Sequence, residues 1–282
     1  MGGRARTKML PILLLAALAA AVPPRIITVP EDVMPAVPER TIIDEHWGKV
    51  ELPPVPAFFI DTLDPNLLQD KGLSDWSQTG LRPWDEYIWD RVAILSQELR
   101  ASNTFVDVGA NLGYFTLAAA ASGYDVVAFE AADHYARKLS RSVWRNGFRE
   151  RVALYQNRVR NASDDLAVVA LSEMFSQGAD AHIVKVNAEG SEGAVLMGAR
   201  HWICSSNVRH VVVEFSEATR ANTEFPATEM FEFMQQAGYD LSDVAPGTGL
   251  IPYDALTAGV FGHVPPNLLF SLRDANSTCI YE

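Results

Sequence analysis

Short apolar runs alternate with longer amphipathic stretches over most of the chain beyond residue 100. Thr104–Val108 and Asp125–Phe129 are short runs rich in Val and Phe, which is typical of buried strands. The apolar stretch between them, about Leu112–Ser122, predicts a helix. Strands and helices that alternate in this way build a mostly parallel sheet with helices on both faces. The hydrophobic pattern therefore predicts a doubly wound α/β fold.

The same alternation continues to the C-terminus. We expect the second helix to be capped by Asp133, to turn Ala136, Leu139 and Val143 inward, and to end at Gly147. Further strands are predicted at Val152–Tyr155, His182–Val186, Val208–Phe215, Tyr239–Val244 and Asn267–Leu272, and further helices at Trp84–Arg100, Leu166–Phe175, Ser191–Arg200 and Glu229–Ala237.

The N-terminal segment has a different pattern. Arg4, Arg6 and Lys8 precede the apolar run 9–22, which contains the small–x–small sequence Ala-Leu-Ala. This is the pattern of a secretory signal peptide. The run is short for crossing a bilayer, which takes about 20 apolar residues, so an uncleaved signal anchor is the second alternative. We therefore predict a secreted or lumenal protein, attached to a membrane only if residues 9–22 are retained as an anchor.

Three further units follow the signal segment. Residues 23–56 are Pro-rich and aperiodic, and they predict a stem or arm without a core of its own. Residues 57–100 predict a cover segment that ends in a helix, and residues 101–282 form the main domain. Glycosylation sequons at Asn161 and Asn276 agree with the secretory route. Cys204 and Cys279 either pair, or remain as a core cysteine and a free cysteine in the tail.

The charge of the chain indicates which kinds of molecule it can bind. The formal net charge is −12, and no long run of Lys and Arg is present, which argues against nucleic acid as a partner. The locally Arg-rich segment Arg137–Arg151 is expected to be a solvated helix face. The histidines are scattered, and no pair has the spacing of metal ligands, so we expect no metal site.

The glycine-containing turn after the first predicted strand, within FVDVGANLGYFT, indicates a ligand site. A dinucleotide site uses G-x-G-x-x-G, whereas Asn111 stands here at the middle glycine position between Gly109 and Gly113. Asp107 at the strand end would repel a pyrophosphate but suits an ammonium group, such as that of S-adenosylmethionine. Glu130 follows the second strand and could accept hydrogen bonds from ribose hydroxyls of either cofactor.

Four stretches together resemble FkbM-type S-adenosylmethionine-dependent methyltransferases: FVDVGANLGYFT, VVAFEA, HIVKVNAEGSEGAVLMGA and HVVVEFS. The resemblance extends from about Trp84 to Asp274. It implies a class I methyltransferase (Rossmann-like) fold with a seven-stranded sheet. It also implies methyl transfer to a hydroxyl oxygen of a glycan or small-molecule acceptor. Carried over by position, the cofactor site would consist of Asp107, Gly109, Ala110, Asn111, Gly113 and Glu130, with Asn157 near the adenine.

The sequence departs from the family pattern at two places. The family reads K-[IV]-D-x-E-G after the fourth strand, whereas this chain has Asn187 in place of the acid, between Lys185 and Glu189. Asparagine cannot take up a proton. The link between Asn157 and Asp165 also looks shorter than is usual in the family. Both departures leave open a relative that binds the cofactor or a partner without turnover.

The catalytic candidates lie on and near this motif. Glu189 is the first choice for the base that removes a hydroxyl proton, and Lys185 could orient the acceptor beside Asn187. The other candidate bases are Glu192, Glu214 and His182, and for each a structural role is an open alternative. A nucleotide-linked oxidoreductase is a distant third hypothesis.

Overall fold

The computed structural model describes residues 46–52, 55–62, 92, 95, 102–161, 168–245, 247–262, 264–273 and 279. The predicted signal segment, most of the predicted arm and the sequon residue Asn276 lie outside these residues. Of the predicted helix Trp84–Arg100, only Val92 and Leu95 are described, and both are helical and buried. In the described part of the chain, no helix combines the length and the apolar character that crossing a bilayer requires.

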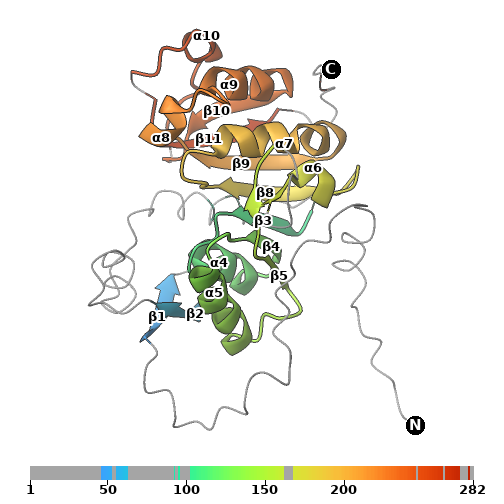
Figure 1. The fold of residues 1–282 in the computed structure, drawn as a ribbon, viewed down its shortest axis with the longest axis vertical. Helices are drawn as coiled ribbons and strands as arrows, with labels where there is room; N and C mark the ends of the chain where they lie inside the picture. The colour runs from blue at the N-terminus through green and yellow to red at the C-terminus, as the bar shows by residue number, and fades with distance from the viewer. Residues whose placement is uncertain are drawn as a thin grey trace.

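A seven-stranded sheet runs through the centre of the domain (Figure 1), in the order β10-β11-β9-β8-β3-β4-β5. The strands are β3 (Thr104–Val108), β4 (Asp125–Phe129), β5 (Val152–Tyr155), β8 (Ala181–Val186), β9 (Val208–Glu214), β10 (Tyr239–Asp243) and β11 (Asn267–Leu272). Five neighbouring strands, from β5 to β9, are parallel, and β11 is antiparallel to both of its neighbours. The predicted doubly wound α/β architecture with a mostly parallel seven-stranded sheet is confirmed.

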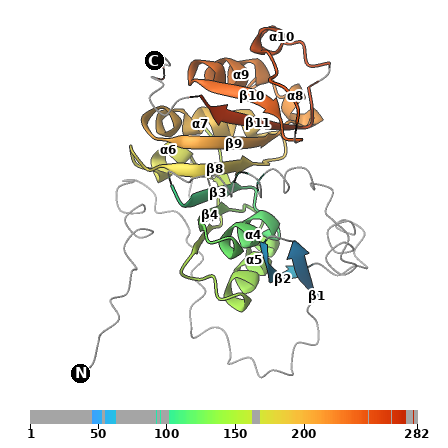
Figure 2. The same cartoon turned by 180° about the vertical axis from the view of Figure 1, so that it is seen from behind.

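Helices cover both faces of this sheet (Figures 1 and 2). One apolar core joins α4 (Tyr114–Ala121) and α5 (Asp133–Arg145) to Phe105 and Ile183 of the sheet. The opposite core joins α6 (Leu171–Met174), α7 (Glu192–Ser205) and α9 (Ala227–Gln236) to the alternate strand residues. Two short helices, α8 (Glu217–Ala221) and α10 (Tyr253–Thr257), complete the described set. Because neighbouring residues of a strand point to opposite faces, one apolar run supplies both cores.

An N-terminal hairpin packs against α4 and α5. Its strands are β1 (His46–Leu52) and β2 (Val55–Thr62), and the buried side chains include Phe58 and Ile60. The hairpin crosses the boundary at residue 56 that separates the predicted arm from the cover segment. In the sequence, two adjacent prolines interrupt the alternation between the two strands, which hides the strand pattern.

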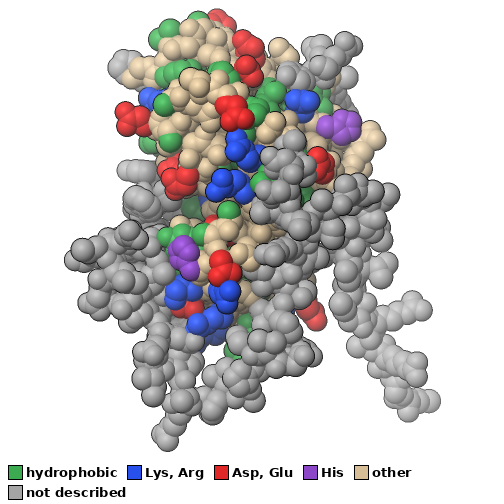
Figure 3. Space-filling view, viewed as in Figure 1, with side chains coloured by type: hydrophobic (Ala, Val, Ile, Leu, Met, Phe, Trp, Pro, Cys, Tyr) green, Lys and Arg blue, Asp and Glu red, His purple; other side chains and the backbone are tan. Residues whose placement is uncertain are grey.

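The Arg-rich segment contacts this hairpin, so the expectation of a purely solvated helix face is corrected. Asp61 is fully buried, and its carboxylate lies 2.9 Å from Lys138 Nζ and 3.2 Å from Arg141 Nε. Figure 3 shows basic side chains gathered over α5 beside acidic ones. A buried carboxylate needs such cationic partners because the protein interior solvates charge poorly. These cations of α5 therefore hold the hairpin in place.

Two local predictions are wrong. Among the described residues of the predicted helix Leu166–Phe175, only those of α6 are helical, and Val168–Val169 instead forms strand β7, which pairs in parallel with β6 (Arg158–Val159). β-branched valines favour the extended conformation. Asp133 is the first residue of α5 rather than its cap, and its side chain accepts a hydrogen bond from Arg137 Nε at 2.7 Å.

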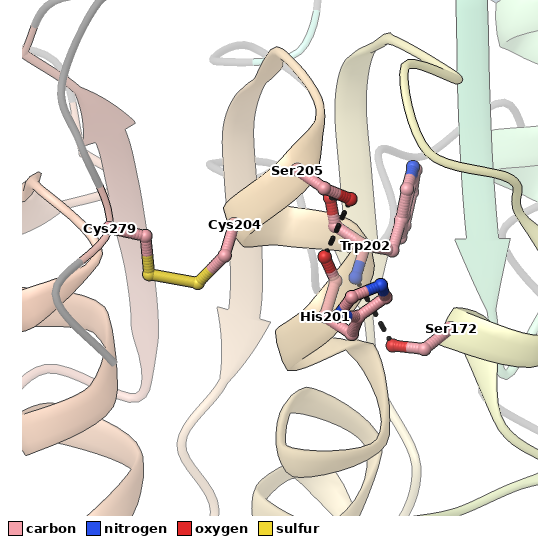
Figure 4. The surroundings of a disulfide bond; sticks show 6 residues. All are labelled: Ser172, His201, Trp202, Cys204, Ser205 and Cys279. Atoms are coloured by element: carbon pink, nitrogen blue, oxygen red, sulfur yellow. Dashed lines mark hydrogen bonds between the residues drawn. A yellow bond between two sulfur atoms is a disulfide. The ribbon is translucent and has the colours of Figure 1, made fainter. Parts of the chain in front are cut away.

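Cys204 and Cys279 form a disulfide (Figure 4), which resolves the alternative left open by the sequence. Cys204 lies in the last turn of α7, and Cys279 lies in the C-terminal tail, with a Cα–Cα distance of 5.2 Å. The bond connects positions separated by 75 residues. It therefore ties the C-terminal tail to the helical layer of the domain.

Candidate functional site

The predicted site residues gather at one edge of the sheet. β3, β4, β8 and β9 are parallel, so their carboxyl ends meet at this edge, where open α/β sheets bind ligands. The turn after β3, the end of β4 and the turn after β8 carry most of the predicted residues.

The glycines of the first turn are required by contacts within the chain itself. Gly109 has φ +76°, and a Cβ there would lie 1.7 Å from the carbonyl oxygen of Asn187. Gly113 has φ +93°, and a Cβ there would lie 2.1 Å from Leu139 Cδ1. The Gly109 and Ala110 amides both donate to the carbonyl oxygen of Phe129, at 3.0 and 2.9 Å. These glycines thus allow the turn to pack between β8 and α5, rather than only clearing space for a ligand.

Glu130 fastens this turn to the end of β4. Its Oε2 accepts a hydrogen bond from the Asn111 amide at 2.7 Å, and its Oε1 accepts one from the Ala132 amide at 2.7 Å. Asn111 adopts φ +52°, and its Oδ1 accepts from the Leu112 amide at 2.7 Å. Asparagine tolerates this left-handed conformation better than most residues. A carboxylate has about four lone-pair sites, so Glu130 retains capacity to accept hydrogen bonds from a ligand.

Asp107 does not present an open negative charge at the edge, contrary to the prediction. It is fully buried, and its Oδ2 accepts a hydrogen bond from Thr116 Oγ1 at 2.7 Å. Its Oδ1 lies 3.1 Å from Lys185 Nζ, which also donates to the Gly109 carbonyl oxygen at 2.8 Å. Asp107 and Lys185 are register partners on neighbouring strands, so their side chains share one face.

This ion pair changes the electrostatic argument. The charge that was expected to attract the ammonium group of S-adenosylmethionine is neutralised within the chain by Lys185. Discrimination against a pyrophosphate can therefore not rest on Asp107 alone. Lys185 is itself 4% exposed, with its ammonium 5.3 Å from the Phe115 ring centroid, so it packs within the core instead of facing an acceptor.

The side chain of Glu192 accepts hydrogen bonds from the turn after β8. Glu192 is fully buried, and its Oε1 accepts from the amides of Ala188 at 2.7 Å and Gly190 at 3.3 Å. Its Oε2 accepts from Thr219 Oγ1 of α8 at 2.7 Å. Glu189 adopts φ +52° and its side chain is exposed. Of these two acids, Glu192 is thus structural, whereas Glu189 remains accessible.

Asn187 keeps an unsatisfied polar atom at this edge. Its amide donates to the Val108 carbonyl oxygen at 3.0 Å, which continues the sheet pairing by one residue. Its Oδ1 is buried and has no hydrogen-bond partner among the described residues. Buried polar atoms are normally paired, so an orphaned one at a ligand-binding edge indicates a missing partner.

The remaining candidates lie apart from this turn. His182 is buried, its Nε2 lies 2.9 Å from the Leu95 carbonyl oxygen, and its ring stacks on Tyr124, which fits a structural role. Asn157 is buried just beyond β5, near the site expected for adenine. There, burial raises the pKa of the Tyr155 phenol, which therefore stays neutral at physiological pH. No group of three His, Cys, Asp or Glu side chains within the described residues could hold a metal ion.

Residues 149–241 match the family described as methyltransferase FkbM domain. The predicted family resemblance is confirmed over these residues. The match contains β5, β8, β9 and the Asn187 turn, and it supports S-adenosylmethionine as the cofactor of the chain. No curated protein sequence matches the chain.

Solved methyltransferase structures resemble the fold at low identity. They include a TehB-like SAM-dependent methyltransferase from Corynebacterium glutamicum, at 12% identity, 72% coverage of this chain, 95% coverage of that chain and a TM-score of 0.42. StiE O-MT has 12% identity, coverage of 79% and 84%, and a TM-score of 0.42. Precorrin-6y C5,15-methyltransferase from Geobacter metallireducens has 11% identity, coverage of 67% and 87%, and a TM-score of 0.39.

Proposed function

We propose that the chain is an S-adenosylmethionine-dependent methyltransferase that methylates a hydroxyl oxygen of a glycan or small molecule. The family match carries the assignment to methyltransferases. The geometry that supports it is the glycine turn held by Glu130 at the carboxyl edge of β3 and β4, beside the unsatisfied Asn187. O-Methylation is favoured over other methylations by the FkbM resemblance.

The residues at the first two strand ends fit the cofactor. Glu130 can accept hydrogen bonds from the ribose hydroxyls with its remaining lone pairs. The first amides of α4 point their positive dipole end toward the same edge, where a carboxylate would be stabilised. Asn157 would contact the adenine. Gly109, Ala110, Asn111 and Gly113 would shape the turn, and Asp107 would act only indirectly, through Lys185 and Thr116. When bound, the cofactor supplies an electrophilic methyl group.

The chain has two further tasks in this reaction. It must align the acceptor oxygen with the methyl carbon, and it must take up the hydroxyl proton. Asn187 can orient the acceptor through its amide, but it cannot take up the proton. Glu189, the first candidate from the sequence, is accessible on the adjoining turn.

We also propose that the protein works in the secretory route. The disulfide supports this, because such bonds persist in oxidising compartments and are rare in the cytosol. Asn161 of the first sequon is exposed, as a glycosylation acceptor must be. Expression with the natural N-terminus in a secreting cell should yield disulfide-bonded protein outside the cytosol. Reduced protein retained in the cytosol would contradict the proposal.

Calorimetry with S-adenosylhomocysteine tests the cofactor site. We expect saturable binding, weakened at least tenfold in Glu130→Gln, since a charge-assisted hydrogen bond contributes about 1.5–3 kcal/mol. Glu150→Gln, at an exposed glutamate, is the matched control and should bind like the original protein. Thermal melting of each variant shows that the fold is intact. Absence of binding by the original protein would overturn the proposed function.

A cofactor-binding protein without turnover is the alternative function, favoured by Asn187. Transfer of labelled methyl groups to a mixed glycan pool separates the two. If only Asn187→Asp transfers methyl groups while both proteins bind S-adenosylhomocysteine, the natural chain is a binding protein. Transfer by the natural chain would establish the enzyme.

A further inference from the structure

The short helix α8 follows β9 and lies beside the ends of β9 and β11 (Figures 1 and 2). β8 and β9 are parallel, and β11 is antiparallel to β9. The end of β8, the end of β9 and the start of β11 therefore lie at the same edge of the sheet. α8 stands there between the turn after β8, which carries Asn187 and Glu189, and the loop that leads into β11.

α8 supports the turn after β8 through three contacts. Thr219 Oγ1 donates a hydrogen bond to Glu192 at 2.7 Å, and the other oxygen of Glu192 accepts from two amides of the turn. Asn222, just beyond α8, donates from its Nδ2 to the Gly190 carbonyl oxygen at 2.8 Å. Gly190 has φ +95°, and a Cβ there would lie 2.9 Å from the Cβ of Ala218. The turn thus packs directly against α8.

Arg220 connects the other side of α8 to the loop before β11. Its Nη1 donates a hydrogen bond to the Phe261 carbonyl oxygen at 3.3 Å, and its Nη2 donates one to the Val264 carbonyl oxygen at 2.8 Å. The guanidinium carbon lies 4.8 Å from the centroid of the Phe215 ring, which packs edge-on against Phe261. A guanidinium is a planar fork that can donate to two acceptors at once and stack on a ring, whereas an ammonium group is a point charge.

The position of α8 depends on these contacts. The helix has five residues, and isolated helices shorter than about 12 residues are marginal in water. Thr219 and Arg220 are neighbours in this helix, so the residue that supports the turn is joined directly to the residue that binds the loop. Hydrogen bonds from a charged donor are about twice as strong as neutral ones. A displacement of the loop should therefore move α8 and, with it, the turn after β8.

We propose that Arg220 is a positioning residue for methyl transfer, which couples the loop before β11 to the turn that carries Asn187 and Glu189. This inference rests on the proposed function. Arg220 acts through α8, because its described contacts are with Phe215 and with the loop. Methyl transfer requires close alignment of donor and acceptor, and a misplacement of about 1 Å can lower a rate about 100-fold. The loop thereby sets the geometry of the transfer edge.

Amide hydrogen exchange of the full chain, resolved by residue, tests the coupling. Arg220→Met should speed exchange of the Ala188 and Gly190 amides at least tenfold, while the amides of β3 remain protected. Arg220→Lys keeps the charge but loses the fork, so it should restore part of the protection. Arg200→Met, at an exposed arginine of α7, is the matched control and should leave exchange unchanged. Unchanged exchange of the turn in Arg220→Met, or equally faster exchange in β3, would overturn the inference.

A second variant breaks the connection on the other side of α8. Asn222 Oδ1 accepts hydrogen bonds from the Glu224 and Phe225 amides, both at 3.0 Å. Asn222→Asp keeps these acceptors but loses the Nδ2 donor to the Gly190 carbonyl oxygen. If Arg220 and Asn222 act along one connection, the double variant should expose the Gly190 amide little more than the stronger single variant does. Additive effects would overturn the coupling.

Transfer of labelled methyl groups to a fixed glycan pool, with S-adenosylmethionine varied, tests the positioning role. Arg220→Met should lower the apparent kcat at least tenfold and leave KM for S-adenosylmethionine within about twofold, a split that a general loss of structure would not give. Arg220→Lys should recover part of kcat, and Arg200→Met should match the original protein.

The outcomes separate this inference from the proposed function. An unchanged kcat in Arg220→Met would overturn the inference, whereas normal binding of S-adenosylhomocysteine by the same variant would leave the proposed function intact. Failure of the original protein to bind S-adenosylhomocysteine would overturn both. Binding without any methyl transfer by the original protein would overturn the positioning role.

Discussion

The two halves of the sheet's carboxyl edge satisfy their polar side chains in different ways. At β3 and β4, Asp107 and Glu130 are paired with groups of the same chain: Thr116, Lys185 and the backbone amides of the turn. At β8 and β11, Asn187 and Asn267 keep buried acceptor atoms without partners among the described residues. In the first half the polar side chains are satisfied within the chain. In the second half the two asparagines have acceptor atoms to which a ligand could donate hydrogen bonds.

This contrast separates residues that a ligand needs from residues that the fold needs. The glycine turn is a conspicuous motif in the sequence, yet in the structure its residues mostly contact other segments of the same chain. In the second half, Asn187 lies within the stretch HIVKVNAEGSEGAVLMGA of the family resemblance, and Asn267 begins the last predicted strand. The following predictions test the contrast from the largest expected effect to the smallest.

Gly109→Ala should have the largest effect on stability. The added Cβ would lie 1.7 Å from the Asn187 carbonyl oxygen, so the turn and β8 must separate. We expect a loss of about 5 kcal/mol in the free energy of unfolding, measured by urea titration. Gly123→Ala is the matched control, since Gly123 also has a positive φ but no atom within 4 Å, and it should lose about 1–2 kcal/mol. Equal losses would contradict the close-contact argument.

Lys185→Met should destabilise the protein by about 3–5 kcal/mol, because it leaves the buried Asp107 carboxylate without its cation. The double variant Asp107→Asn with Lys185→Met should recover much of this loss. A double-mutant cycle in urea measures the coupling between the two side chains. Additive losses would show that the pair is not coupled, and Asp107 would then be available to a ligand.

Thr219→Val should cost about 1–3 kcal/mol, because it removes the hydroxyl that donates to the buried Glu192. The turn that carries Asn187 and Glu189 should loosen. Hydrogen exchange of the Ala188 and Gly190 amides measures this, and we expect faster exchange there than in β3. Unchanged exchange would show that α8 does not support the turn.

Glu189→Gln should change the free energy of unfolding by less than about 0.5 kcal/mol, because the side chain is exposed. Thermal melting checks this. A larger loss of unfolding free energy would show that the Glu189 side chain stabilises the fold.

Much of the fold could be predicted from the sequence. The seven central strands and the main helices follow from local apolar periodicity, and several strand bounds agree with the structure to the residue, such as Thr104–Val108 and Asn267–Leu272. The wrong predictions lie where the local hydrophobic pattern is weak or interrupted. They are the hairpin interrupted by prolines and the Val168–Val169 strand, which was expected to be helical.

The site was only partly predictable. The sequence places Asp107, Gly109 and Glu130 at the ends of two neighbouring strands, but it does not reveal that Lys185 pairs with Asp107 or that Glu192 is buried against Thr219, because these contacts join distant parts of the chain. Asn267, whose Oδ1 is buried without a hydrogen-bond partner among the described residues, is inconspicuous in the sequence. A polar residue at the start of an apolar strand is its only signal in the sequence.

By itself the sequence determined the order of strands and helices, the glycine turn and the resemblance to FkbM methyltransferases, because side-chain periodicity and short motifs are local properties of the chain. The tertiary structure alone decided which polar groups neutralise one another and which remain open. Register between strands sets those pairings, and register depends on how the whole sheet assembles. The Asp107–Lys185 pair arises in this way.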